Sequence, residues 1–126
     1  IYGMLGYFKL LRNDDLDETT KLCEEAYDYN SDDRDIKDNL SICYFRKGEY
    51  EKAEKISDEL VGSTPNFVEG FYHGIQIAMK LNKYDKAAEY AEKLKECKRS
   101  GMTTVTEEEV NKLIQEVKNH NENTIG

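Results

Sequence analysis

Residue types recur every 34 positions along this chain, and that period constrains the fold more than any other feature of the sequence. Ile56 lies 34 residues after Leu22 and 34 residues before Tyr90. Ala53 lies 34 residues before Ala87, and no insertion breaks the register. A unit of this length cannot bury its own apolar side chains, so the copies are expected to stack and to build a continuous core between them.

The clearest copy of the repeat includes residues 38–59, which the sequence predicts to be two amphipathic helices that meet at Gly48. Gly48 suits a tight turn because glycine accepts a positive φ at no steric cost. Pro65 is expected to end the second helix, since proline has no N–H to donate and clashes with the preceding turn. Apolar residues recur at helical spacing on both sides of the glycine: Leu40, Tyr44 and Phe45 before it, and Tyr50, Ala53, Ile56 and Leu60 after it.

Together, the period and the segment NLSICYFRKGEYEKAEKISDEL that precedes Pro65 make the chain resemble the tetratricopeptide repeat family. The resemblance covers three repeats, at about 1–33, 34–67 and 68–101. The second and third repeats match best, and the first is degenerate. The resemblance implies an all-α fold, an α-solenoid of three antiparallel helix hairpins, in which short turns keep the two helices of each pair antiparallel.

A single domain is expected over residues 1–126. The segment after the third repeat departs from the pattern, and a seventh helix at about 106–119 is predicted to cap the exposed edge of that repeat. Thr106 and Glu109 have the spacing of a capping box at its start. Residues 120–126 are expected to fray. The six helices of the three repeats are predicted at about 2–12, 16–29, 34–47, 49–61, 67–81 and 83–97.

The sequence contains no constellation typical of an enzyme, a metal site or a cofactor site. Its two histidines, His73 and His120, lie far apart, and no Cys-x-x-Cys pair, phosphate-binding loop or dinucleotide fingerprint occurs. Glu107, Glu108 and Glu109 fall at the start of a predicted helix, where carboxylates complement the helix dipole. No catalytic residue, metal or cofactor is therefore predicted.

Charge and composition exclude further classes of function. The net charge of −8, from 18 basic and 26 acidic residues, argues against nucleic-acid binding, which favours a basic surface. No apolar run approaches the roughly 18 residues of a membrane span. Cys23, Cys43 and Cys97 all fall inside predicted helices and indicate free thiols in a reducing compartment, so a cytoplasmic location is expected.

A binding surface is therefore the expected site of function. In tetratricopeptide repeats the first helix of each hairpin lines a concave groove, and the resemblance implies that this groove holds a peptide or a partner helix. Arg12, Arg46 and Lys80 lie 34 residues apart, and this cation ladder would pair with a ligand carboxylate or complement the helix C-termini. The groove residues that the resemblance implies are Met4, Phe8, Arg12, Asn39, Ile42, Arg46, Tyr72, His73, Gln76, Met79 and Lys80.

One subfamily of these repeats holds the C-terminal carboxylate of heat-shock chaperones with a set of basic and amide side chains. Here Asn39 matches the amide that the third helix supplies to that set. Glu69 and His73 replace the Lys and Arg of the fifth helix, and Ile1 and Leu5 occupy the first-helix positions. A complete carboxylate clamp is therefore not expected. Three repeats followed by a final helix are also similar to the C-terminal module of large immunophilins.

The leading interpretation is a non-enzymatic protein–protein interaction module of the adaptor, scaffold or co-chaperone type. Because the chain begins at Ile1, almost at the first residue of a repeat and without Met, an alternative is the accessory domain of a larger enzyme such as a peptidyl-prolyl isomerase. A second alternative is an assembly subunit that associates with itself through the first repeat or the seventh helix. The sequence leaves the oligomeric state and the identity of the partner open.

Overall fold

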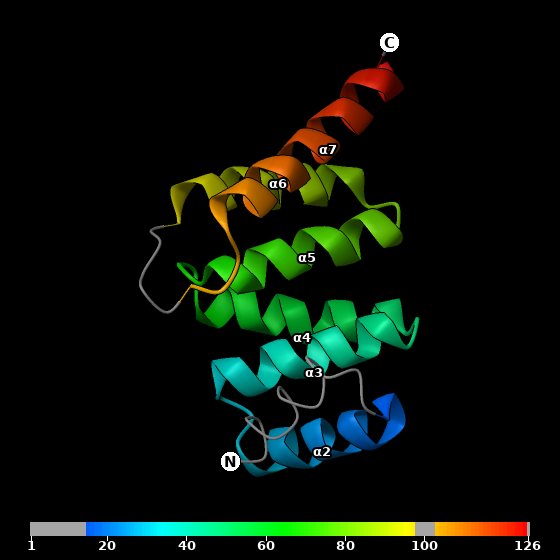
Figure 1. Cartoon of the computed structure of the whole chain (residues 1–126), viewed down its shortest axis with the longest axis vertical. Helices are drawn as coiled ribbons and strands as arrows, with labels where there is room; N and C mark the ends of the chain where they lie inside the picture. The colour runs from blue at the N-terminus through cyan, green and yellow to red at the C-terminus, as the bar shows by residue number, and fades with distance from the viewer. Residues whose placement is uncertain (1–14, 98–102, 126) are drawn as a thin grey trace.

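The computed structural model describes residues 15–97 and 103–125, and every regular element in those ranges is an α-helix. The helices follow one another in chain order along the long axis of the molecule (Figure 1). The predicted all-α solenoid is confirmed, while the helix predicted at 2–12 lies outside the described residues. The helices are α2 (Leu16–Tyr29), α3 (Arg34–Arg46), α4 (Tyr50–Ser63), α5 (Val68–Lys80), α6 (Tyr84–Glu96) and α7 (Glu107–Ile125).

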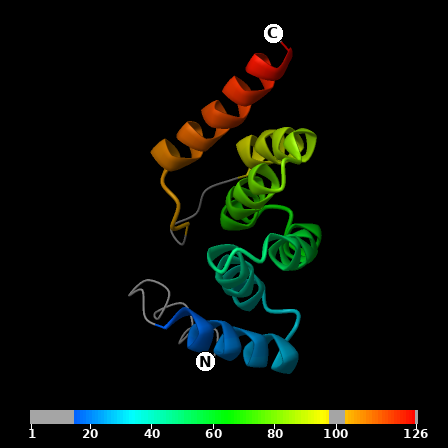
Figure 2. The same cartoon turned by 90° about the vertical axis from the view of Figure 1, so that its right-hand side faces the viewer.

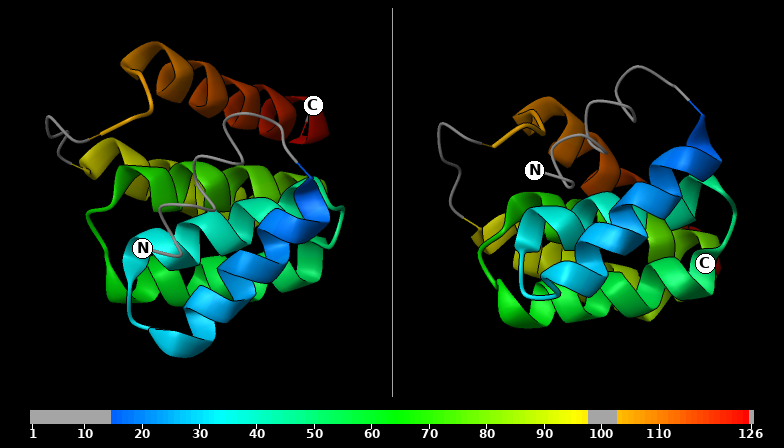
Figure 3. Two further views of the ribbon diagram at one scale, coloured as in Figure 1. Left: turned by 60° about the horizontal axis from the view of Figure 1, so that its bottom comes forward. Right: turned by 90° about the horizontal axis from the view of Figure 1, so that it is seen from below.

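Helices that are neighbours in the sequence pack against each other. α3 packs most extensively on α4, and α5 on α6, and the contact between α4 and α5 joins these two hairpins. α3 and α5 lie on one side of the stack, and α4 and α6 on the other (Figure 2). α2 crosses α3 obliquely at one end of the molecule (Figure 3), and α7 packs on α6 and α5 at the other. Because α3 also contacts α5 directly, the first helices of the two hairpins form one face.

The turn within each described hairpin depends on a residue with a positive φ. Gly48 has a φ of 80°, as predicted, and Asn82, which lies 34 residues later, has a φ of 60°. Asparagine is one of the few residues besides glycine that adopt this conformation readily. In both turns the backbone N–H of the next residue donates to the carbonyl five positions before it, at 2.9 Å. The two turns are therefore the same structure built from different residues.

Side-chain caps fix the positions at which α2, α3 and α7 begin. The Asp15 carboxylate accepts the N–H of the second residue of α2 at 3.0 Å, and Asp33 does the same for α3 at 2.9 Å. At α7 the predicted capping box is confirmed, because Thr106 Oγ1 accepts the N–H of Glu109 at 3.0 Å. In return, the Glu109 carboxylate accepts the N–H of Thr106 at 3.2 Å. These bonds satisfy donors that have no partner inside the helix.

Two clusters of buried apolar side chains form the core of the described part of the chain. The larger cluster joins α5, α6 and α7, and Leu113 and Val117 bring the apolar face of α7 into it. α7 therefore covers an edge that α5 and α6 would otherwise expose to water. The smaller cluster lies between α2, α3 and α4 and consists of Cys23, Leu40, Cys43 and Ile56.

The prediction that the last helix ends near residue 119 is wrong, because α7 continues to Ile125. Neither proline nor glycine interrupts this stretch, and Gln115 Nε2 donates to Asn119 Oδ1 at 2.7 Å. The ring of His120 stacks on Tyr84 of α6 with centroids 3.7 Å apart, and this contact holds the extended end of the helix on the stack. The other described helices begin and end within two residues of their predicted positions.

Candidate functional site

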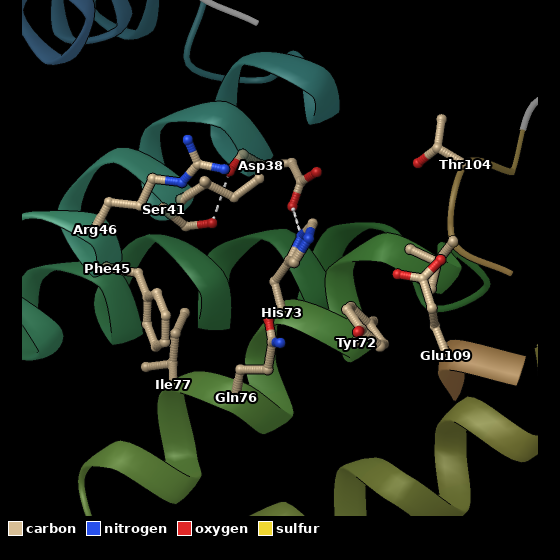
Figure 4. A pocket seen from close by; sticks show the side chains of 12 residues that line it. Asp38, Ser41, Phe45, Arg46, Tyr72, His73, Gln76, Ile77, Thr104 and Glu109 are labelled. Carbon is tan, nitrogen blue, oxygen red and sulfur yellow. Dashed lines mark hydrogen bonds and ion pairs between the residues drawn. The ribbon is translucent and has the colours of Figure 1, made fainter. Parts of the chain in front are cut away.

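A cavity of about 490 Å³ lies on the side of the stack formed by α3 and α5, and we call it the α3–α5 groove. The two helices line it along its length, and the 103–106 segment and the start of α7 border one end (Figure 4). The groove is thus made by the first helix of each of two successive hairpins. Its lining residues are Asp38, Ser41, Ile42, Phe45, Arg46, Tyr72, His73, Gln76, Ile77, Thr104, Val105 and Glu109.

An ion pair between α3 and α5 lies at the centre of the groove. His73 Nδ1 lies 2.7 Å from Asp38 Oδ1, and the two side chains are 21% and 11% exposed (Figure 4). Burial lowers the pKa of His73, but the charge of Asp38, its hydrogen bond and the charge of Glu69 raise the pKa by more, so that it lies above 6.5. His73 therefore keeps its imidazolium form to a higher pH than a free histidine does.

The 103–106 segment is tied to α5 by Glu69. This carboxylate is only 7% exposed, and its Oε1 accepts hydrogen bonds from Thr104 N at 2.7 Å and Thr104 Oγ1 at 3.2 Å. The tie places Val105 in the core and brings Glu109 to the rim of the groove. Glu69 occupies the position at which chaperone-binding repeats have a lysine. In this chain its side chain bonds to Thr104 and connects the 103–106 segment to α5.

The two ends of the groove differ in chemistry. Figure 4 places Phe45 and Ile77 toward one end and Tyr72 and Glu109 toward the other. Ile77 is buried and supplies an apolar surface at its end. At the opposite end burial raises the pKa of Tyr72, and the carboxylates of Glu109 and Glu116 raise it further. The Phe45–Ile77 end therefore offers apolar surface beside the cation of Arg46, and the other end lies in the field of negative charges.

The structure brings part of the predicted groove together. Of the cation ladder, Arg46 lines the groove, Lys80 is exposed in the last turn of α5 without lining it, and Arg12 lies outside the described residues. The ladder therefore presents a single cation to the described part of the groove. The predicted residues that line the groove are Ile42, Arg46, Tyr72, His73 and Gln76.

Other predicted residues lie elsewhere. Asn39 is buried within α3 at 5% exposure, and Met79 packs against the core cluster of α5, α6 and α7. Neither residue is among those that line the groove. Met4 and Phe8 lie outside the described residues.

Sequence reasoning missed the contribution of the segment before α7. Thr104, Val105 and Glu109 line the groove, yet they lie beyond the last repeat, where no periodicity marks a side chain as facing a groove. The capping box at Thr106 is the one local signal that could have placed them, since it fixes where α7 starts. Ser41 was also missed, because its small polar side chain fits a core position as well as a groove position.

Two kinds of site do not occur among the described residues. Within 15–97 and 103–125, no group of three His, Cys, Asp or Glu side chains is placed to hold a metal ion. None of the helices in the same ranges has the length and apolar character needed to cross a membrane. What the groove does offer is apolar surface, hydrogen-bonding groups and charges of both signs, the contacts that a polypeptide can use.

Comparison with known proteins gives the same architecture. A family model described as tetratricopeptide repeat matches residues 10–69. The Sgt2 TPR domain from Aspergillus fumigatus superposes with a TM-score of 0.83 at 16% identity, over 98% of this chain and 78% of that one. The MamA RS-1 ArsTM double mutant gives 0.75 at 16% identity, over 97% and 65%.

A third solved structure extends the comparison. The Hsp90 co-chaperone Cns1 from Saccharomyces cerevisiae superposes with a TM-score of 0.76 at 12% identity, over 98% of this chain and 39% of that one. At such identities the likeness concerns the fold. No curated protein sequence matches the chain.

Proposed function

Because this chain belongs to the tetratricopeptide repeat proteins, we propose that it is a protein–protein interaction module whose α3–α5 groove holds a peptide or helical segment of a partner. One observation carries the proposal: the first helices of two successive repeats face one cavity that offers apolar surface at one end and carboxylates at the other. Such a cavity suits an extended or helical segment, whose side chains alternate between apolar and polar contacts.

The proposed role is of the adaptor, scaffold or co-chaperone type. One structural neighbour, Cns1, is an Hsp90 co-chaperone. The groove of this chain is not proposed to clamp a chaperone tail, because Glu69 is engaged by Thr104 and His73 by Asp38. We propose instead that the partner contacts the apolar surface near Phe45 and the polar groups of Gln76 and Arg46.

We also propose that residues 1–126 form one domain of three repeats, with limits at about 1–33, 34–67 and 68–101. The 34-residue period that runs through all three supports this division. The burial of α7 side chains against α5 and α6 supports the inclusion of the C-terminal helix in the same unit.

Peptide selection followed by groove substitution tests the proposed function. Peptides that bind the protein are selected from a random library, and their affinities are measured by fluorescence anisotropy. Gln76→Trp fills the middle of the groove, and we expect it to weaken the selected peptides by about tenfold or more. Lys55→Trp, on an exposed position of α4, is the matched control and should leave the affinities unchanged.

Circular dichroism of both variants verifies that the helices are intact. If the Gln76→Trp and Lys55→Trp proteins bind the selected peptides as tightly as the wild type, the groove is not the binding site. If the library yields no binding peptide at all, the proposed function is wrong.

A further inference from the structure

We propose that the α3–α5 groove selects a partner segment with a lysine or arginine side chain, which lies at the Tyr72–Glu109 end while apolar side chains lie at the Phe45–Ile77 end. This inference rests on the proposed function, because it specifies the chemistry of the segment that occupies the same groove. It differs from the carboxylate ligand that the cation ladder suggests from the sequence alone.

Carboxylates from two helices converge on the Tyr72–Glu109 end. Glu109 of α7 lines the groove there, and Glu116 lies close enough on α7 to raise the pKa of Tyr72. Asp38 of α3 lines the adjacent centre of the groove. At the start of α3, burial raises the pKa of Asp35, and the charges of its acidic neighbours, Asp38 among them, add to this effect although Arg34 lowers it. A cation entering this end therefore meets a field set by several negative charges.

The internal contacts of these carboxylates leave negative charge at the rim. The bonds that Glu109 accepts from Thr106 N and Thr106 Oγ1, at 3.2 and 3.0 Å, come from neutral donors and do not cancel its charge. Glu109 is also exposed, so a ligand can reach it. The protein cations in the lining are the imidazolium of His73, which is paired with Asp38, and Arg46, which Figure 4 places toward the opposite end.

An aromatic ring lies beside these carboxylates. Tyr72 is half-buried, and its ring is T-shaped relative to the His73 ring with centroids 5.6 Å apart. A lysine or arginine side chain packs its alkyl or guanidinium part on such a ring while its charge faces a carboxylate. An acidic side chain at the same place would meet both the negative face of the ring and the carboxylates.

Three labelled peptides of about 16 residues test the inference by fluorescence anisotropy. All three carry the same apolar residues on one helical face, and they differ in having lysine and arginine, glutamine, or glutamate at the flanking positions. We expect the basic peptide to bind about tenfold or more tighter than the acidic one, and its advantage to shrink as salt is added.

A pair of double variants assigns the effect to the groove. We expect E109Q/E116Q to weaken the basic peptide by about three- to tenfold and to leave the glutamine peptide unchanged. Glutamine retains the capping box, so α7 should remain intact. E107Q/E108Q, on the same helix outside the groove, changes the net charge by the same amount and should have less than about a twofold effect.

The outcomes separate the two proposals. Equal binding of the three peptides, tighter binding of the acidic one, or equal effects of the two double variants would overturn the selection of a cation and leave the interaction groove in place. Failure of all three peptides, and of peptides selected from a random library, would overturn the proposed function together with this inference.

Discussion

His73 and Asp38 make the contact between α3 and α5 depend on pH. The pKa of His73 is raised in the folded protein, so the pair stabilises the fold fully below about pH 6.5, the pKa of an unfolded histidine. This contribution is lost as the pH rises through the folded-state pKa. The protonation of His73 and its contact with α3 therefore change together as the pH rises through that pKa.

We predict that His73→Asn removes this dependence. The asparagine Nδ2 can still donate to Asp38, but it does not titrate. The free energy of unfolding lost in the variant should be larger at about pH 6 than at about pH 9, as measured by urea denaturation followed by circular dichroism. Gln76→Ala, at a groove position that does not titrate, should instead cost the same at both pH values. A His73→Asn cost that is constant across this range would contradict the prediction.

The cysteines offer a second test at the scale of single residues. Cys23 and Cys43 are fully buried with their Sγ atoms 3.7 Å apart, whereas Cys97 is half-buried. The hydrogen bond to Cys43 raises the pKa of Cys23, and burial raises it further. Burial keeps both thiols of this pair away from disulfide reagents, which react only with a thiolate that they can reach.

We predict that one thiol reacts with a disulfide reagent in the native protein and that the remaining two react only on unfolding. Burial also raises the pKa of Cys97, so its reaction should be faster at about pH 9 than at about pH 7. Absorbance of the released thiolate measures both phases, and Cys97→Ser should remove the fast one. Rapid reaction of all three thiols in buffer without denaturant would show that the α2–α3 contact opens readily.

Two glycines on neighbouring helices have opposite roles. A Cβ at Gly74 of α5 would lie 3.1 Å from the Tyr90 ring and 3.2 Å from Ser57 Oγ. The Tyr90 ring has little room to move, because its hydroxyl donates to Asp58 at 3.0 Å and the ring makes a T-shaped contact with Phe71. Close approach of the helices therefore depends on the absence of a side chain at Gly74.

We predict that Gly74→Ala destabilises the protein by about 1–2 kcal/mol, since overpacking outweighs the gain in helix propensity. Gly62→Ala, near the end of α4 where a Cβ would contact nothing within 4 Å, should stabilise the protein by about 0.5–1 kcal/mol. Urea denaturation of the two variants gives both values. A stabilised Gly74→Ala protein would mean that Tyr90 relaxes at little cost.

At the scale of elements, local signals predicted most of the fold and less of the groove. The repeat period and the turn glycine were sufficient to place α2–α6, and the capping box placed the start of α7. The end of α7 was not predictable, because its polar sequence resembles a frayed tail and the stabilising contact of His120 is to Tyr84, 36 residues earlier. The pairing of His73 with Asp38, at a separation of 35 residues, is likewise a property of packing.

The residues that line the groove were harder to predict from local sequence signals than the helices were. The resemblance to tetratricopeptide repeats implied the groove-facing positions Ile42, Tyr72 and Gln76. It gave no information on Thr104, because a loop position depends on the partner that anchors it, and that partner is the buried Glu69. From the sequence, a carboxylate such as that of Glu69 on a repeat helix is expected to be exposed and to contact a ligand. Only the structure shows that it is buried and bonded to Thr104.

For the molecule as a whole, the stability of each helix depends mainly on the helices next to it in the stack. Each helix contacts its neighbours along the chain, and α7 reaches α6 and α5 but does not pack on α2 or α4. Repeat arrays of this kind behave as chains of nearest-neighbour interactions, so a defect at one end weakens the adjacent units first. The two core clusters support this division, since α7 takes part only in the larger one.

We predict that Leu113→Ala lowers the free energy of unfolding by about 2–5 kcal/mol, because the side chain is 7% exposed within the cluster that joins α5, α6 and α7. Lys112→Ala, at an exposed position one residue earlier, should change it by less than about 0.5 kcal/mol.

In native-state hydrogen exchange, the amides of α5, α6 and α7 should lose protection in Leu113→Ala, while those of α2 and α3 lose less. An equal loss of protection in all helices would mean that the stack unfolds as one cooperative unit. In that case α7 would stabilise the α3–α5 groove by stabilising the fold of the entire chain. The hydrogen bond between Thr104 and Glu69 would then not be the main link between α7 and the groove.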